Sequence, residues 1–157
     1  MKSKHLFSLL IAAAWLCGGC VTNTPAVPDP TTDQQLATGI ATGNAMLEAF
    51  RTDNATDFLA QLPENSTAQF GEKEFTASRK NMIDTMGELK SYEFLCCLEM
   101  PQPAAVNGKQ PLLRPLIWKV RFLRKTVSGR DVYQEMLFRA VIGELDGKPY
   151  VLSFGFL

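Results

Sequence analysis

The sequence predicts an α+β domain with three N-terminal helices packed on one face of a curved, four-stranded antiparallel sheet. Apolar residues recur at three- and four-residue spacing as far as residue 86, which is the period of amphipathic helices. From Tyr92 onward, apolar and polar residues alternate, which is the period of half-buried strands. Turn residues separate the alternating runs, so the strands should form a meander with the helices on one side.

Three helices are expected. The first covers 34–51, and its apolar face consists of Leu36, Ile40, Leu47 and Phe50. Gly39 and Gly43 lie four residues apart on it and suit a close approach to another element. A short second helix starts after Asn54, a residue that favours the N-cap position, and the third covers about 73–86.

Four strands are expected, each with one inward face. In the first strand this face comprises Tyr92, Phe94, Cys96, Leu98 and Met100, and a loop over 101–115 follows. The inward faces of the next two comprise Leu116, Trp118, Val120 and Phe122, then Gln134, Met136, Phe138, Ala140 and Ile142. Asp146-Gly147 predicts a hairpin before a last strand whose inward residues are Leu152, Phe154 and Phe156.

The outer face of this sheet is expected to be charged and solvated. Arg121 and Glu135 are placed to pair across two strands. The apolar residues predicted on the same face are Ile117, Leu123, Leu137 and Val141. If these are exposed, they favour an assembly surface for an envelope protein, or a homodimer formed through the outer sheet face.

The first twenty residues have the pattern of an export signal. Lys2 and Lys4 give a positive start, an apolar run covers 6–16, and two glycines precede Cys20. The apolar run is too short to cross a bilayer as a permanent helix. The sequence therefore predicts a leader that is removed.

Residues 16–20 resemble a lipobox, the site where a lipoprotein signal peptidase cuts before a lipid-modified cysteine. Gly18 and Gly19 match the small positions of that pattern, whereas Cys17 stands where an aliphatic residue is usual. The resemblance implies a diacylglyceryl thioether on Cys20, often with a further acyl chain, and two or more chains anchor a protein stably. The alternative is an ordinary secreted protein that is cleaved nearby.

The chain is thus expected to have three segments: a leader at 1–19, the lipid-anchored Cys20 with a tether to residue 34, and one domain at 35–157. The tether is rich in Pro and Thr and has no apolar period, so it should be disordered. An irregular arm packed on the domain is the alternative. This organisation predicts a bacterial cell-envelope location, with the domain facing the periplasm or the exterior.

The element order over 35–157, the short helix within 57–63 and the aromatic-rich last strands resemble the nuclear-transport-factor-2-like superfamily. That superfamily has the cone-shaped fold of the ketosteroid-isomerase-like and polyketide-cyclase-like families. Within it, the chain is most similar to small secreted bacterial domains. The resemblance implies a pocket between the curved sheet and the helices. A cystatin-like arrangement, with one helix wrapped by a sheet, is the alternative fold.

The inward aromatic side chains either fill the core or line an apolar pocket for a small hydrophobic ligand. The pocket lining would be Tyr92, Phe94, Trp118, Phe122, Gln134, Phe138 and Phe154. An isomerase-like site needs an inward carboxylate, but the alternation places Glu93, Glu99 and Glu135 on the outer face. We therefore expect a non-catalytic ligand-binding or protein-interaction domain. The alternative is an isomerase- or dehydratase-like enzyme acting on a small hydrophobic substrate.

The composition argues against several other classes of function. The 16 basic and 16 acidic residues leave no positive excess to attract nucleic acid. His5, the single histidine, lies in the leader, so we expect no metal site and no cofactor. Cys96 is expected to be buried and Cys97 to lie on the opposite face, where it could form an intermolecular disulfide.

Overall fold

The computed structural model describes residues 30–63, 69–102, 112–145 and 148–157. Three helices precede four strands: α1 (Pro30–Thr52), α2 (Ala55–Leu59), α3 (Glu72–Met86), β1 (Glu88–Cys97), β2 (Leu112–Lys125), β3 (Asp131–Leu145) and β4 (Lys148–Phe156). The predicted α+β class is therefore confirmed. The predictions for the leader, for Cys20, for the tether up to residue 29 and for the Asp146-Gly147 hairpin turn lie outside the described residues.

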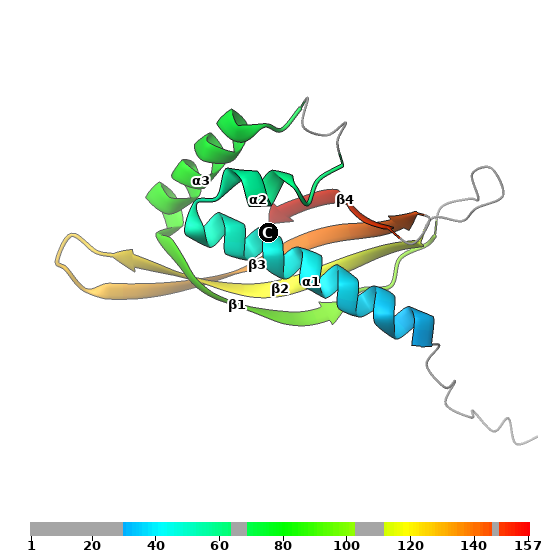
Figure 1. Cartoon of the computed structure of the whole chain (residues 1–157). Helices are drawn as coiled ribbons and strands as arrows, with labels where there is room; N and C mark the ends of the chain where they lie inside the picture. The colour runs from blue at the N-terminus through cyan, green and yellow to red at the C-terminus, as the bar shows by residue number, and fades with distance from the viewer. Residues whose placement is uncertain (1–29, 64–68, 103–111, 146–147) are drawn as a thin grey trace, which may run out of the picture.

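The strands form one antiparallel sheet in the order β1-β2-β3-β4, which is the predicted meander. Figure 1 shows all three helices on one side of a curved sheet, with α1 running obliquely across it and α3 farther from it. The core lies between these two layers. Because three helices cover the sheet rather than one, the cystatin-like alternative is wrong.

Helix α1 packs tightly on the middle of the sheet. It begins at Pro30, four residues before the predicted start, because proline is favoured at the first helical position. Gly43 faces Trp118 so closely that an added Cβ would lie 2.2 Å from the indole ring. Trp118 is completely buried, and its Nε1 donates a hydrogen bond to Oδ1 of Asn44 at 2.9 Å. The predicted close-packing role of the glycines is therefore confirmed at Gly43.

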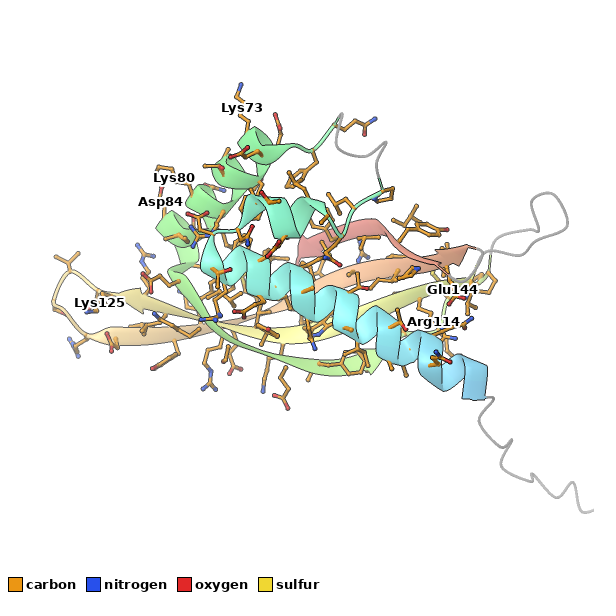
Figure 2. All side chains as sticks on the ribbon, in the orientation of Figure 1. Lys73, Lys80, Asp84, Arg114, Lys125 and Glu144 are labelled. Carbon is orange, nitrogen blue, oxygen red and sulfur yellow. The ribbon has the colours of Figure 1, made fainter. Side chains whose placement is uncertain are left out.

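Helix α2 begins where the sequence predicts it. Asn54 Oδ1 accepts a hydrogen bond from the Asp57 backbone N–H at 3.0 Å, which is the predicted N-cap of α2. On α3, Lys73, Lys80 and Asp84 point away from the sheet (Figure 2), and Phe75 is the buried residue. Among the described residues, no helix is long and apolar enough to cross a bilayer.

Strand β1 differs from its predicted register at its end. Phe94 pairs with Trp118 but Cys96 pairs with Ile117, so Leu95 is an extra residue. Such a bulge moves the following side chains to the opposite face. The expected burial of Cys96 is therefore wrong, because Cys96 is exposed on the outer side. Leu98 and Met100, which were predicted to continue the inward face, lie beyond the strand.

A register shift between β3 and β4 changes the predicted inward face of β4. Val141 pairs with Ser153 but Ile142 pairs with Val151, so Leu152 has no partner. Val151 turns inward and is 2% exposed, whereas Leu152 is 58% exposed. The prediction that Leu152 shares a face with Phe154 is therefore wrong.

Strand β2 begins at Leu112, inside the predicted loop, and includes Pro115. The Pro115 carbonyl accepts a hydrogen bond from the Leu98 N–H at 2.8 Å, so the ring nitrogen of Pro115 also faces the β1 side of the strand. Strand β1 has already ended there, at Cys97. The missing N–H therefore costs no ladder bond with β3, which explains why proline is tolerated at this position.

The outer face of the sheet is charged, as expected, but less apolar than predicted. Arg121 pairs with Glu135 at 2.8 Å, as predicted. Ile117 and Val141 are only 6% and 8% exposed, so they do not contribute to an exposed patch. Leu123 is partly buried, and Leu137 is 40% exposed.

Candidate functional site: an aromatic cavity

An apolar cavity of about 180 Å³ lies between the two shorter helices and the last two strands. Its walls come from every helix and from β3 and β4. The lining residues are Leu47, Phe50, Phe58, Phe70, Phe75, Ser78, Met82, Phe138, Phe154, Gly155 and Phe156. The cavity is therefore enclosed mainly by aromatic rings.

These rings hold one another at the distances and angles of edge-to-face pairs. Phe58 and Phe154 have centroids 5.2 Å apart and ring planes at 75°, and Phe70 and Phe154 lie 5.3 Å apart at 82°. Phe50 and Phe156, which also line the cavity, have centroids 5.2 Å apart and ring planes tilted at 58°. Such pairs contribute about 0.5–1.5 kcal/mol each beyond the area that they bury. The walls are therefore preorganised by contacts among the rings themselves.

Polar chemistry is sparse in this cavity. Ser78, an exposed residue of α3, supplies the hydroxyl of the described lining. No carboxylate, histidine, cysteine or cationic side chain belongs to the part of the lining that the structure describes. The cavity is thus suited to holding an apolar group, with the Ser78 hydroxyl as the polar side-chain group of the described lining.

Of the residues predicted to line a pocket, the structure brings Phe138 and Phe154 to this cavity. Trp118 and Phe122 are fully buried elsewhere in the core, and the indole of Trp118 is covered by α1 at Gly43. Both of these residues fill the core. Phe138 connects the two regions, because its ring lies 5.9 Å from that of Trp118.

The remaining three predicted lining residues are partly buried and lie away from the cavity. Phe94 packs edge-on against Trp118, with centroids 5.5 Å apart. Gln134 faces inward opposite Phe122, as the alternation predicted. Tyr92 belongs to a polar cluster beside α1. All three side chains face inward, as the alternation predicted, but they lie outside the lining of this cavity.

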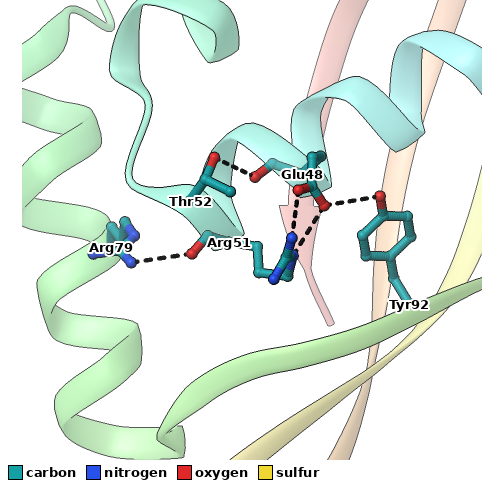
Figure 3. Close-up of polar contacts among 5 residues, drawn as sticks. All are labelled: Glu48, Arg51, Thr52, Arg79 and Tyr92. Atoms are coloured by element: carbon teal, nitrogen blue, oxygen red, sulfur yellow. Dashed lines mark hydrogen bonds and ion pairs between the residues drawn. The ribbon is translucent and has the colours of Figure 1, made fainter.

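The polar cluster lies where the end of α1 passes over β1 (Figure 3). Tyr92 Oη donates to Glu48 Oε2 at 3.2 Å, and Arg51 Nε donates to the same oxygen at 2.9 Å. The hydrogen bond from Arg51 lowers the pKa of Glu48, while partial burial, reinforced by the charge of Glu48, raises the pKa of Tyr92. Sequence reasoning missed this carboxylate because it sought acids on the sheet, whereas Glu48 comes from a helix.

Arg79 joins α3 to the end of α1 (Figure 3). Its Nε donates to the Phe50 carbonyl at 2.7 Å, and Nη1 pairs with the Asp53 carboxylate at 3.1 Å. The guanidinium also lies 5.9 Å from the centre of the Phe50 ring. Because Phe50 lines the cavity, Arg79 fixes one of its walls from outside. This cation is engaged by protein groups rather than directed into the cavity.

The cysteines and the acidic residues make no site with the cavity. Cys96 and Cys97 are free and exposed. Although the residue is exposed, desolvation of its sulfur raises the pKa of the Cys97 thiol, which lowers its thiolate fraction and its reactivity. Across the described ranges, no three His, Cys, Asp or Glu side chains converge in a way that could hold a metal ion.

Comparison with known proteins shows the fold and no more. No family model matches the chain, and no curated protein matches it either. Its structure is similar to that of Aln2 from a Streptomyces species, with a TM-score of 0.50 and 10% sequence identity over 82% of this chain and 91% of that one. A second match has a TM-score of 0.44 and 14% identity, covering 82% of this chain and 98% of an NTF-2-like protein of unknown function from Shewanella oneidensis.

Proposed function

We propose that the chain is an envelope lipoprotein whose domain binds a small hydrophobic ligand without transforming it. The cavity of about 180 Å³ between α2, α3 and the last two strands supports the binding function, whereas the lipid anchor rests on the resemblance of residues 16–20 to a lipobox. Protein interiors are normally packed as densely as organic crystals, and a void forfeits the contacts of the atoms around it. A ligand that fills the cavity would restore those contacts.

The distribution of polar groups favours binding over catalysis. General acid–base chemistry requires a titratable group within hydrogen-bond reach of the reacting atom. The carboxylate of Glu48 and the phenol of Tyr92 hydrogen-bond to each other outside the cavity lining. An isomerase- or dehydratase-like mechanism that used this pair would need a substrate bound at the α1–β1 edge, where Glu48 is already paired with Arg51.

A broad panel of hydrophobic metabolites, screened by thermal shift, tests the binding proposal. We expect at least one compound to raise the melting temperature, because a ligand that binds only the native state stabilises it by mass action. Ser78→Phe should abolish this shift by placing a ring at the cavity. Ala77→Phe is the matched control: Ala77 is exposed on the same helix and lies outside the lining, so the shift should persist. If no compound shifts the wild-type protein, the binding proposal fails.

The anchor is tested separately, at two cysteines three residues apart. We expect Cys20→Ser to move the protein from the membrane fraction to the soluble fraction, because the variant lacks the sulfur that the lipid would modify. Cys17→Ser should leave it in the membrane fraction. Mass spectrometry of the membrane-extracted protein should locate the acyl mass on an N-terminal Cys20. A Cys20→Ser protein that stays membrane-bound would rule out the lipid anchor.

A further inference from the structure

We infer that the ligand of the aromatic cavity is an uncharged molecule about the size of a single substituted ring, with at most one hydroxyl group. This inference rests on the proposed binding function and narrows it to a chemical class. It is drawn from the volume of the cavity, the composition of its walls and the position of Ser78.

The volume limits the size of the ligand. The cavity holds about 180 Å³. An engineered apolar void of about 150 Å³ in another protein accommodates one benzene molecule. A molecule of one ring with one or two small substituents therefore fits, whereas a four-ring molecule such as pyrene exceeds the space. The ring pairs that frame the cavity, such as Phe58 with Phe154 at 5.2 Å, would have to separate to admit a larger ligand.

The walls limit the charge of the ligand. Burying an ion without a partner is so costly that the group is neutralised instead. The nearby cation Arg79 is held by the Phe50 carbonyl and by Asp53. A carboxylate or ammonium ligand would therefore find no counter-charge among the described lining residues. Aromatic walls also favour an aromatic guest, because ring edges and faces attract each other.

Ser78 sets the polarity that the site tolerates. Its hydroxyl is exposed and belongs to the lining, so it stands where the cavity meets solvent. A hydroxyl can donate one hydrogen bond and accept others. One hydroxyl on the ligand can therefore be satisfied there, while the rest of the molecule lies against Phe75, Phe138 and Phe154.

Four probes test this inference by isothermal titration calorimetry on the whole purified protein at pH 7: toluene, 4-methylphenol, benzoate and pyrene. We expect toluene and 4-methylphenol to bind. Benzoate should bind at least about tenfold more weakly, which corresponds to 1.4 kcal/mol, and pyrene should not bind. Ser78→Ala should weaken the binding of 4-methylphenol and leave the binding of toluene unchanged. Ser78→Phe should abolish the binding of both compounds, whereas Ala77→Phe should preserve it.

The outcomes separate this inference from the proposal beneath it. If pyrene binds while toluene and 4-methylphenol do not, the ring-size inference is overturned and the binding function stands. If benzoate binds as tightly as toluene, the inference of an uncharged ligand is overturned. If no probe binds and the broad hydrophobic panel is also negative, both the inference and the proposed function are wrong.

Discussion

Gly43→Ala should strongly destabilise the protein. In an exposed helix this substitution gains about 1 kcal/mol, because alanine is the better helix former. Here the added methyl would lie 2.2 Å from the indole of Trp118. The indole cannot turn aside freely, because it is fully buried and donates to Asn44 at 2.9 Å. Overpacking a core usually lowers the free energy of unfolding by about 1–3 kcal/mol. We expect Gly43→Ala to lower it by at least the upper end of that range, as measured by urea denaturation.

Gly39→Ala is the matched control, one helical turn earlier. Its added Cβ would meet Cδ1 of Leu116 at 2.9 Å, which is the end of a flexible side chain. A small rotation of Leu116 can relieve that contact, so the net change should stay within about 1 kcal/mol. If the two variants prove equally stable, α1 does not depend on the close approach at Gly43.

Phe75→Ala should have an effect of similar size, located at the other end of the helical layer. Phe75 is the buried residue of α3, and its ring packs 4.9 Å from Phe58 and 6.2 Å from Phe50. Removing a buried phenylalanine side chain costs about 3–5 kcal/mol. Phe75 is the buried apolar residue of α3, and the polar contacts of Arg79 hold the helix only at its surface, so the α3 amides of the variant should also exchange with deuterium faster than those of β2 and β3.

Phe70→Ala provides the comparison for that prediction. Phe70 lines the same cavity but is only partly buried, and it precedes α3 rather than belonging to it. We expect a smaller loss of stability and near-normal protection of the α3 amides. The prediction is contradicted if the two variants lose the same stability, or if deuterium exchange of the α3 amides is unchanged in Phe75→Ala. Contacts other than those of Phe75 would then hold α3 in place.

The layers of this fold could be predicted because they depend on local periodicity. The 3.6-residue period located the helices, and the two-residue period located the strands and most of their inward residues, including Trp118, Phe122 and Phe138. The register shifts could not be predicted in this way. The extra residues Leu95 and Leu152 are defined only by pairing with the neighbouring strand. One extra residue moves each later side chain of that strand to the opposite face of the sheet.

The cavity was only partly predictable for a related reason. Periodicity says which face a residue occupies but not which helix lies above it. Trp118 lies beneath Gly43, so it is covered. Phe138 and Phe154 lie where α2 and α3 leave space. The missed wall residues Phe75 and Met82 did show an apolar face in the sequence, but that pattern predicts packing equally well.

The contact between Trp118 and Phe138 links the fluorescence of the tryptophan to the occupancy of the cavity. Beyond Cys20 the chain contains a single tryptophan, because the other is Trp15. The centre of the Trp118 indole lies 5.9 Å from that of the Phe138 ring, and Phe138 lines the cavity. A guest that displaces Phe138 by a fraction of an ångström would change the emission of that one fluorophore. Occupancy of the cavity can therefore be followed in the unlabelled protein by its intrinsic fluorescence alone.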